Sequence, residues 1–292
     1  PVLWLYRSKM LFDSFLTKLL SKLVSLEILV INLLIAGMII KAASMYESPL
    51  FLFSIAFILT VAAYLLRNHL KLELLKLAIL LGLAVLLPNY IFLQKGLETV
   101  YHNLLHYHPR FIHLEQDGAV FFFFLLTAGF FSKMFAHLPM IGQYVEGNFF
   151  RGIQKLFVGS VIWSTIILAF SSMTLVSVIN TKSFEHENQL LFFMLEQQME
   201  EVFLVFVFIA LFISILIEGS KASQSLFQGK SIFTFVNFGV AGILVAYFYL
   251  SGTSFISIFL LFGVLNSIIC IAHLVIVLIR HKNIQTRNVD IN

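Results

Sequence analysis

The chain has 292 residues, of which 60% are hydrophobic and only 12% carry a charged side chain. Soluble domains carry about a quarter charged residues, so this composition excludes an ordinary soluble protein, and its hydrophobicity excludes intrinsic disorder. A single cysteine excludes an internal disulfide. The net charge of +4 is explained by basic loops on one side of a membrane, and no nucleic acid partner is expected.

Eight apolar stretches each approach the roughly 20 residues that a helix needs to cross a bilayer. They are continuous, which favours helices over the alternating strands of a membrane barrel. We therefore predict an all-α fold, a polytopic membrane bundle of about eight transmembrane helices, with the lipid bilayer as its surroundings. The predicted spans are residues 24–42, 49–66, 73–94, 119–138, 156–179, 195–217, 231–251 and 254–279.

The N-terminal residues 1–23 form a separate segment in this prediction. Over residues 10–23 the apolar side chains share one helical face, while Lys18 and Lys22 lie on another. An amphipathic helix on the membrane surface and a first helix packed against the bundle both fit this pattern. Residues 24–279 then make a single transmembrane domain, and residues 280–292 make a short cytoplasmic tail.

Basic and acidic residues alternate from loop to loop. With the N-terminus inside, the inner segments hold cations such as Arg67 and Lys71, whereas the outer segments collect acids such as Glu98 and Glu187. The positive-inside rule then places both termini in the cytoplasm or on the equivalent inner side.

The outer loop before the 119–138 span is rich in histidine, with His102, His106 and His108. If residues 97–107 are helical, His102 and His106 stand one turn apart, a spacing that suits two imidazole ligands of one divalent metal. An interfacial amphipathic helix, in which histidine has no special role, is the competing interpretation. No other cofactor is indicated, because the glycine motifs of nucleotide sites and nucleophile elbows are absent.

The 195–217 span contains a short apolar run, about 16 residues from Val202 to Ile217. We expect the helix to recruit upstream residues to cross the bilayer. That extension draws Glu196, Glu200 and Glu201 toward the membrane on one broad helical face. Such carboxylates can bind a cation or carry a proton; carboxylates solvated in the outer headgroup layer are the alternative.

The last span carries Asn266, Cys270 and His273 at the spacing i, i+4, i+7. This spacing puts them on one face of a helix, which we expect to point into the bundle. They fit either interhelical hydrogen bonding that holds the bundle together or a functional polar lining.

Residues 235–268, which read FVNFGVAGILVAYFYLSGTSFISIFLLFGVLNSI, resemble the last region of the CPBP family of intramembrane CAAX proteases and bacteriocin-immunity proteins. The residues that carry the resemblance are Tyr247, Tyr249, Gly252, Thr253, Ser254 and Asn266. The position of the family's histidine holds Phe262, and Glu200-Glu201 keeps the family's glutamate pair without its arginine. The resemblance therefore implies a degenerate, catalytically inactive relative of these proteases.

Three functions compete. A transporter or permease that moves an ion or small solute is the first, and its substrate- or ion-binding residues would be Glu196, Glu200, Glu201, Asn266 and His273. A non-catalytic subunit that assembles with another membrane protein is the second, because the loops are short and no site is complete. A degenerate CPBP-type protein is the third. We do not expect the chain to be an enzyme.

Overall fold

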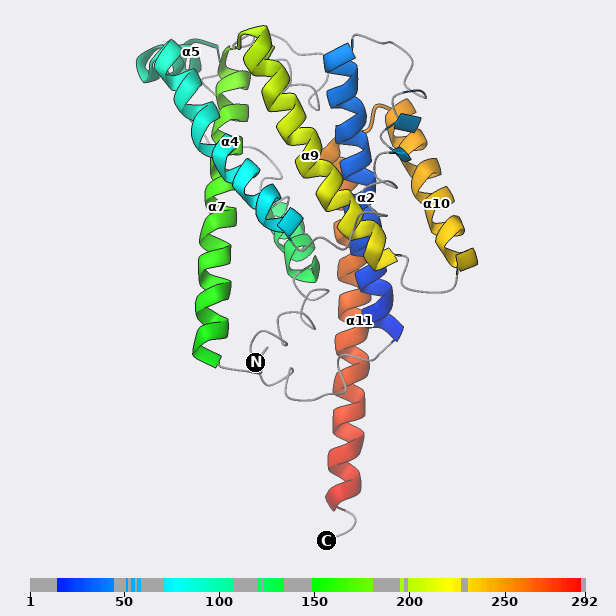
Figure 1. Ribbon diagram of the computed structural model, residues 1–292. Helices are drawn as coiled ribbons and strands as arrows, with labels where there is room; N and C mark the ends of the chain where they lie inside the picture. The colour runs from blue at the N-terminus through cyan, green and yellow to red at the C-terminus, as the bar shows by residue number, and fades with distance from the viewer. Residues whose placement is uncertain are drawn as a thin grey trace. The chain divides into compact units, whose positions relative to one another are not determined.

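The structure is a computed structural model, and it describes residues 15–44, 51, 54–55, 57–58, 71–107, 120–121, 123–133, 149–180, 195–196, 199–226 and 231–289. All regular secondary structure in these ranges is helical, in agreement with the predicted all-α fold. The labelled helices in Figure 1 are α2 (Phe15–Ser44), α4 (Lys71–Lys95), α5 (Leu97–Tyr107), α7 (Phe149–Asn180), α9 (Glu201–Leu226), α10 (Ser231–Leu250) and α11 (Phe255–Val289).

Within the described residues three helices are long and apolar enough to cross a membrane, which supports an integral membrane protein. Shorter apolar helices coincide with four more predicted spans, while the predicted 49–66 span lies largely outside the described residues. The total of eight spans therefore stays a prediction. The three long spans are Phe15–Lys41, Glu201–Ser223 and Phe255–Ile276, and the shorter helices are Leu74–Tyr90, Phe123–Lys133, Phe157–Met173 and Gly239–Leu250.

Helix α2 runs without a break through the predicted boundary at residue 24. Lys18 and Lys22 are exposed, as the amphipathic pattern predicts, but Leu20 is buried against Cys270 of α11. The contact favours a first helix packed within the protein over a separate surface helix, whose presence over residues 10–23 is not confirmed.

The chain divides into two compact units. Unit 1 comprises Pro1–Glu27, Gly118–Gln154 and Ile256–Asn292, and unit 2 comprises Ile28–Asp117 and Lys155–Phe255. The predicted division into an N-terminal segment, one transmembrane domain and a tail stays a prediction.

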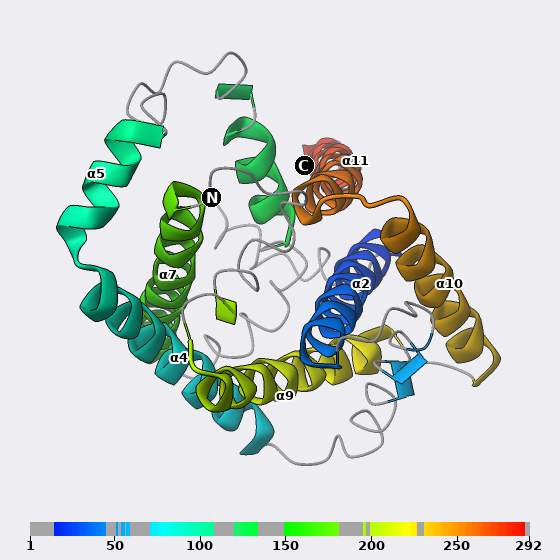
Figure 2. The ribbon, with the colours of Figure 1, turned by 90° about the horizontal axis from the view of Figure 1, so that it is seen from above.

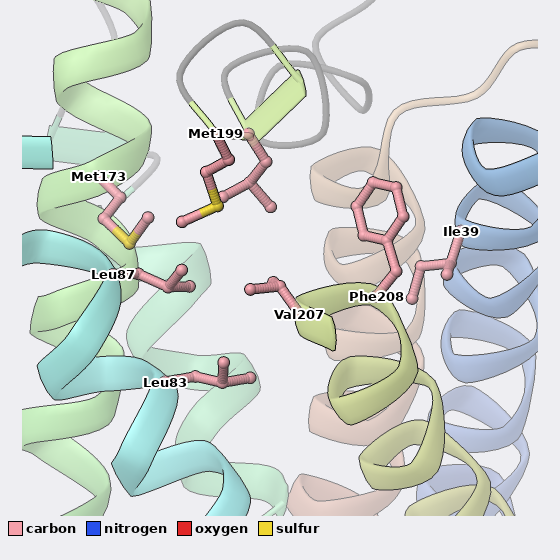
Figure 3. Packing of buried hydrophobic residues seen from close by; sticks show 8 residues of the cluster. Ile39, Leu83, Leu87, Met173, Met199, Val207 and Phe208 are labelled. Atoms are coloured by element: carbon pink, nitrogen blue, oxygen red, sulfur yellow. The ribbon is translucent and has the colours of Figure 1, made fainter. Parts of the chain in front are cut away.

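Unit 2 is built around the packing of α4 against α9 (Figures 1 and 2). The chain turns from α4 into α5 at Gly96, whose φ of 73° lies in the left-handed region that glycine adopts without strain. Figure 3 shows an apolar cluster within the unit, with side chains from α2, α4, α7 and α9 and from the residues just before α9. Its buried members are Ile39, Leu83, Leu87, Met173, Leu195, Met199, Val207 and Phe208.

An ion pair also joins α4 to α9 in unit 2. The Lys76 ammonium donates a hydrogen bond to the Glu218 carboxylate, and it lies 5.3 Å from the centre of the Trp163 ring. The Lys76 side chain is only 11% exposed, whereas that of Glu218 is 31% exposed. The pair therefore keeps part of its hydration.

Helix α9 gains its membrane-crossing length at its C-terminal side. The span begins at Glu201 and continues beyond Ile217 to Ser223. Within this extension the hydroxyls of Ser220 and Ser223 donate hydrogen bonds of 2.7 Å to the carbonyls three residues earlier. Because these bonds satisfy the hydroxyls locally, the serines can remain in an apolar helix. The sequence predicts an extension upstream of Val202, but α9 begins at Glu201, so its added length lies mainly downstream.

Candidate functional site

A buried carboxylate lies in the core-facing stripe of α2 within unit 1. Leu20, Val24 and Glu27 follow the spacing i, i+4, i+7, and all three are buried. Glu27 has no exposed surface at all. A charged group in an apolar interior requires a partner, since an isolated buried charge is very costly. The position of Glu27 therefore depends on the helices that face it.

Two glycines bring the helix Phe123–Lys133 close to α11. A Cβ atom built on Gly263 would lie 3.3 Å from the Cα atom of Gly129, so the backbones meet where neither residue carries a side chain. Small residues commonly permit such close crossings in membrane bundles. The rings of Phe130 and Phe259 pack beside the crossing, with centroids 5.2 Å apart.

The crossing places Lys133 against Glu27. The Lys133 Nζ lies 2.5 Å from Oε1 of Glu27, and the same ammonium group lies 3.7 Å from the centre of the Phe259 ring. The Lys133 side chain is 19% exposed. The positive charge of Lys133 balances the negative charge of Glu27, so the pair has no net charge. The face of the Phe259 ring stabilises the Lys133 ammonium further.

Asn266 of α11 completes the site. Its side-chain nitrogen lies 3.4 Å from Oε2 of Glu27, which is longer than the usual N–H···O distance of about 2.9 Å. Asn266 is fully buried, and its Oδ1 has no hydrogen-bond partner among the residues that the structure describes. Folded proteins satisfy most buried polar atoms. This oxygen is therefore an unused acceptor next to a carboxylate.

The site lies at the middle of two apolar spans. Glu27 is the thirteenth of the 27 residues in Phe15–Lys41, and Asn266 is the twelfth of the 22 residues in Phe255–Ile276. At about 1.5 Å per residue, each stands roughly 15–20 Å from both ends of its helix. In a helix that crosses a membrane, this position is near the centre of the hydrocarbon layer.

The polar stripe predicted on α11 is buried. Asn266, Cys270 and His273 continue the buried face that begins with Ile258 and Phe262. Their shared orientation agrees with the spacing of the sequence. The structure brings Asn266 to the Glu27–Lys133 pair, and His273 lies two turns further along the same face.

The three predicted carboxylates near α9 lie in unit 2 and are exposed. Glu201 is the first residue of α9, and the carbonyl of Glu200 accepts a 2.9 Å hydrogen bond from the Leu204 amide. Glu196 stands between the buried residues Leu195 and Met199, and desolvation raises the pKa of its carboxyl above the ordinary value. Their role in binding stays a prediction.

The histidine pair lies on α5, which spans Leu97–Tyr107, as the sequence predicted. Both His102 and His106 are exposed, and His102 Nε2 lies 4.0 Å from Oε1 of the exposed Glu98. No group of three or more His, Cys, Asp or Glu side chains is arranged for a metal within the described ranges. His108 lies outside those ranges, and the metal site stays a prediction.

Sequence reasoning did not single out Glu27 or place Lys133 at a site. Both signals were nevertheless present, because Glu27 is the one acid in the predicted 24–42 span and Lys133 falls within the predicted 119–138 span. Ionisable residues inside apolar spans are rare and usually functional. Helical periodicity does not show that these two residues form a pair.

Comparison of the chain with protein-family models, with curated proteins and with solved structures finds no match.

Proposed function

We propose that this membrane protein is a transporter that moves an ion past the Glu27–Lys133–Asn266 site. The observation that carries the proposal is the fully buried Glu27, at the middle of an apolar span, paired with the largely buried Lys133. Charged groups at this depth cost at least about 2.5–3.5 kcal/mol each by insertion scales, and they usually mark ion or substrate pathways.

A purely structural role is a weaker explanation of the pair. Replacing a buried ion pair by apolar residues of similar volume is often neutral or stabilising, so such a pair is poor evidence for stability. The glycine crossing and the contact of Phe130 with Phe259 already join the Phe123–Lys133 helix to α11 without any charge. Leu20 of α2 likewise packs against Cys270 of α11. An ion pair that adds little to stability is better explained by a function that needs charge.

The test is uptake of radioactive sodium and rubidium by vesicles that contain the purified full-length chain. We expect uptake above that of protein-free vesicles, and we expect the double variant Glu27→Gln/Lys133→Met to abolish it. The matched control is Lys76→Met/Glu218→Gln, which removes the other ion pair and should leave uptake unchanged. Absence of uptake by the unmodified protein would favour the alternative of a non-catalytic subunit that needs a partner.

A further inference from the structure

We propose that the Glu27–Asn266 site binds a monovalent cation of the sodium class in exchange for one proton of Lys133. The inference rests on the proposed transport function and names its substrate class. It adds that Lys133 serves as a tethered substitute for the transported cation.

The ligands of the site define the class of cation. Glu27 contributes two carboxylate oxygens. Asn266 turns its Nδ2 toward Oε2 of Glu27, so a flip of its side-chain amide would present to a cation the Oδ1 that lacks a donor in the described part of the chain. Hard oxygen ligands suit alkali and alkaline-earth ions, not soft transition metals. One carboxylate balances one positive charge, so a divalent ion would leave an uncompensated charge at membrane depth, where charge is costly.

Lys133 already holds the carboxylate that such a cation would need. Its ammonium contacts Oε1 of Glu27 at 2.5 Å, whereas the Asn266 amide reaches Oε2 only at 3.4 Å. The carboxylate cannot hold the ammonium and a second cation together without a net positive charge. Binding of the cation therefore displaces Lys133.

Charge balance determines the fate of the displaced lysine. The cation binds the Glu27 carboxylate, an N–H bond of the Lys133 ammonium breaks, and the proton passes to water, leaving a neutral amine. The site is neutral before and after this step, and no oxidant or reductant is required. A neutral amine is also the form of lysine that an apolar interior accepts most readily.

Other titratable groups face the same helices and must be distinguished from Lys133. On the buried face of α11 the other titratable groups are Cys270 and His273. On α2 they are Lys18 and Lys22, which are exposed. The substitution Lys133→Arg separates them, because a guanidinium keeps the ion pair but does not lose its proton in proteins.

The experiment measures protons released when sodium chloride is added to the purified chain in weakly buffered detergent, with choline chloride as the ionic-strength control. The unmodified protein should release about one proton per bound sodium ion, with saturation. Lys133→Arg should lose this release while keeping its thermal unfolding midpoint. The matched variant Lys76→Arg, at the lysine paired with Glu218 in unit 2, should retain it.

If Lys133→Arg fails to fold, the double variant Glu27→Gln/Lys133→Met replaces it and should also release no proton. Release that persists in a folded Lys133 variant, or no release from the unmodified protein, would overturn the inference. Sodium uptake into vesicles without proton release would refute the exchange and leave transport standing. Proton release without uptake would refute transport and leave the binding site standing.

Discussion

The ammonium of Lys133 lies 2.5 Å from the carboxylate of Glu27, although the two residues are 106 positions apart in the chain. Glu27 is fully buried within the first apolar span, and the two helices that face it come from the middle and the end of the sequence. The pair thus depends on tertiary packing, and its consequences can be tested by substitutions on each side.

Removal of one charge should destabilise the protein far more than removal of both. Glu27→Gln leaves the Lys133 ammonium without its counter-charge, which should cost about 3–5 kcal/mol of unfolding free energy. The double variant Glu27→Gln/Lys133→Met should be close to neutral, because both charges are gone. Unfolding in detergent provides the measurement. Equal losses in the single and double variants would show that the pair is not coupled.

The glycine crossing should tolerate a methyl group less well than an open glycine does. Gly263→Ala places a Cβ atom 3.3 Å from the Cα of Gly129, so a helix must shift, at a cost of about 1 kcal/mol. Gly242→Ala is the matched control, since nothing lies within 4 Å of its Cβ position. That change should be neutral or slightly stabilising, because alanine favours a helix. An equal change in stability from Gly263→Ala and Gly242→Ala would mean that α11 and the Phe123–Lys133 helix do not meet at the glycines.

The carboxyl of Glu196 predicts a pH dependence of stability. Its pKa is raised in the folded protein, so the folded state holds this proton to higher pH than the unfolded state does. Its stabilising contribution is therefore present below the unfolded pKa and is lost as the pH rises through the folded pKa. Glu196→Gln should raise the thermal midpoint relative to the unmodified protein above that range and have little effect below it. A pH-independent difference between the two would contradict the prediction.

The predicted orientation can be tested with introduced cysteines. The native Cys270 is buried and is first replaced by alanine. A cysteine at Lys182 should then react with a membrane-impermeant maleimide added from outside, whereas one at Lys71 should react only after permeabilisation, because the positive-inside rule places Lys71 within. The reverse labelling pattern would show that the predicted orientation is wrong.

The helices were largely predictable from the sequence, because long apolar runs indicate helices in a membrane. The residues at which the helices begin and end were less predictable. α2 continues through Lys18 and Lys22, since charges on one exposed face do not break a helix, and α9 extends through serines that satisfy their own hydroxyls. Hydropathy registers such residues as polar and does not show that they are compatible with the helix.

The site was predictable only in part. The burial of Asn266 follows from helical spacing, and it was expected. Lys133 falls within the predicted 119–138 span, but hydropathy and the charge of loops do not show which residue a buried lysine pairs with. Its contact with Glu27 lies beside the close approach of the Phe123–Lys133 helix and α11 at Gly129 and Gly263, and no local pattern encodes either contact.

The most direct test of the exchange is the internal pH of sealed vesicles that contain the chain, followed with a trapped dye while a sodium gradient is imposed. Inward sodium should make the interior more alkaline, and outward sodium should make it more acidic, with the same response when valinomycin and potassium hold the membrane potential at zero. Glu27→Gln/Lys133→Met vesicles should show neither change. A pH response that follows the imposed voltage and not the sodium gradient, or no response at all, would contradict the assignment of Glu27 and Lys133 as an electroneutral exchange site.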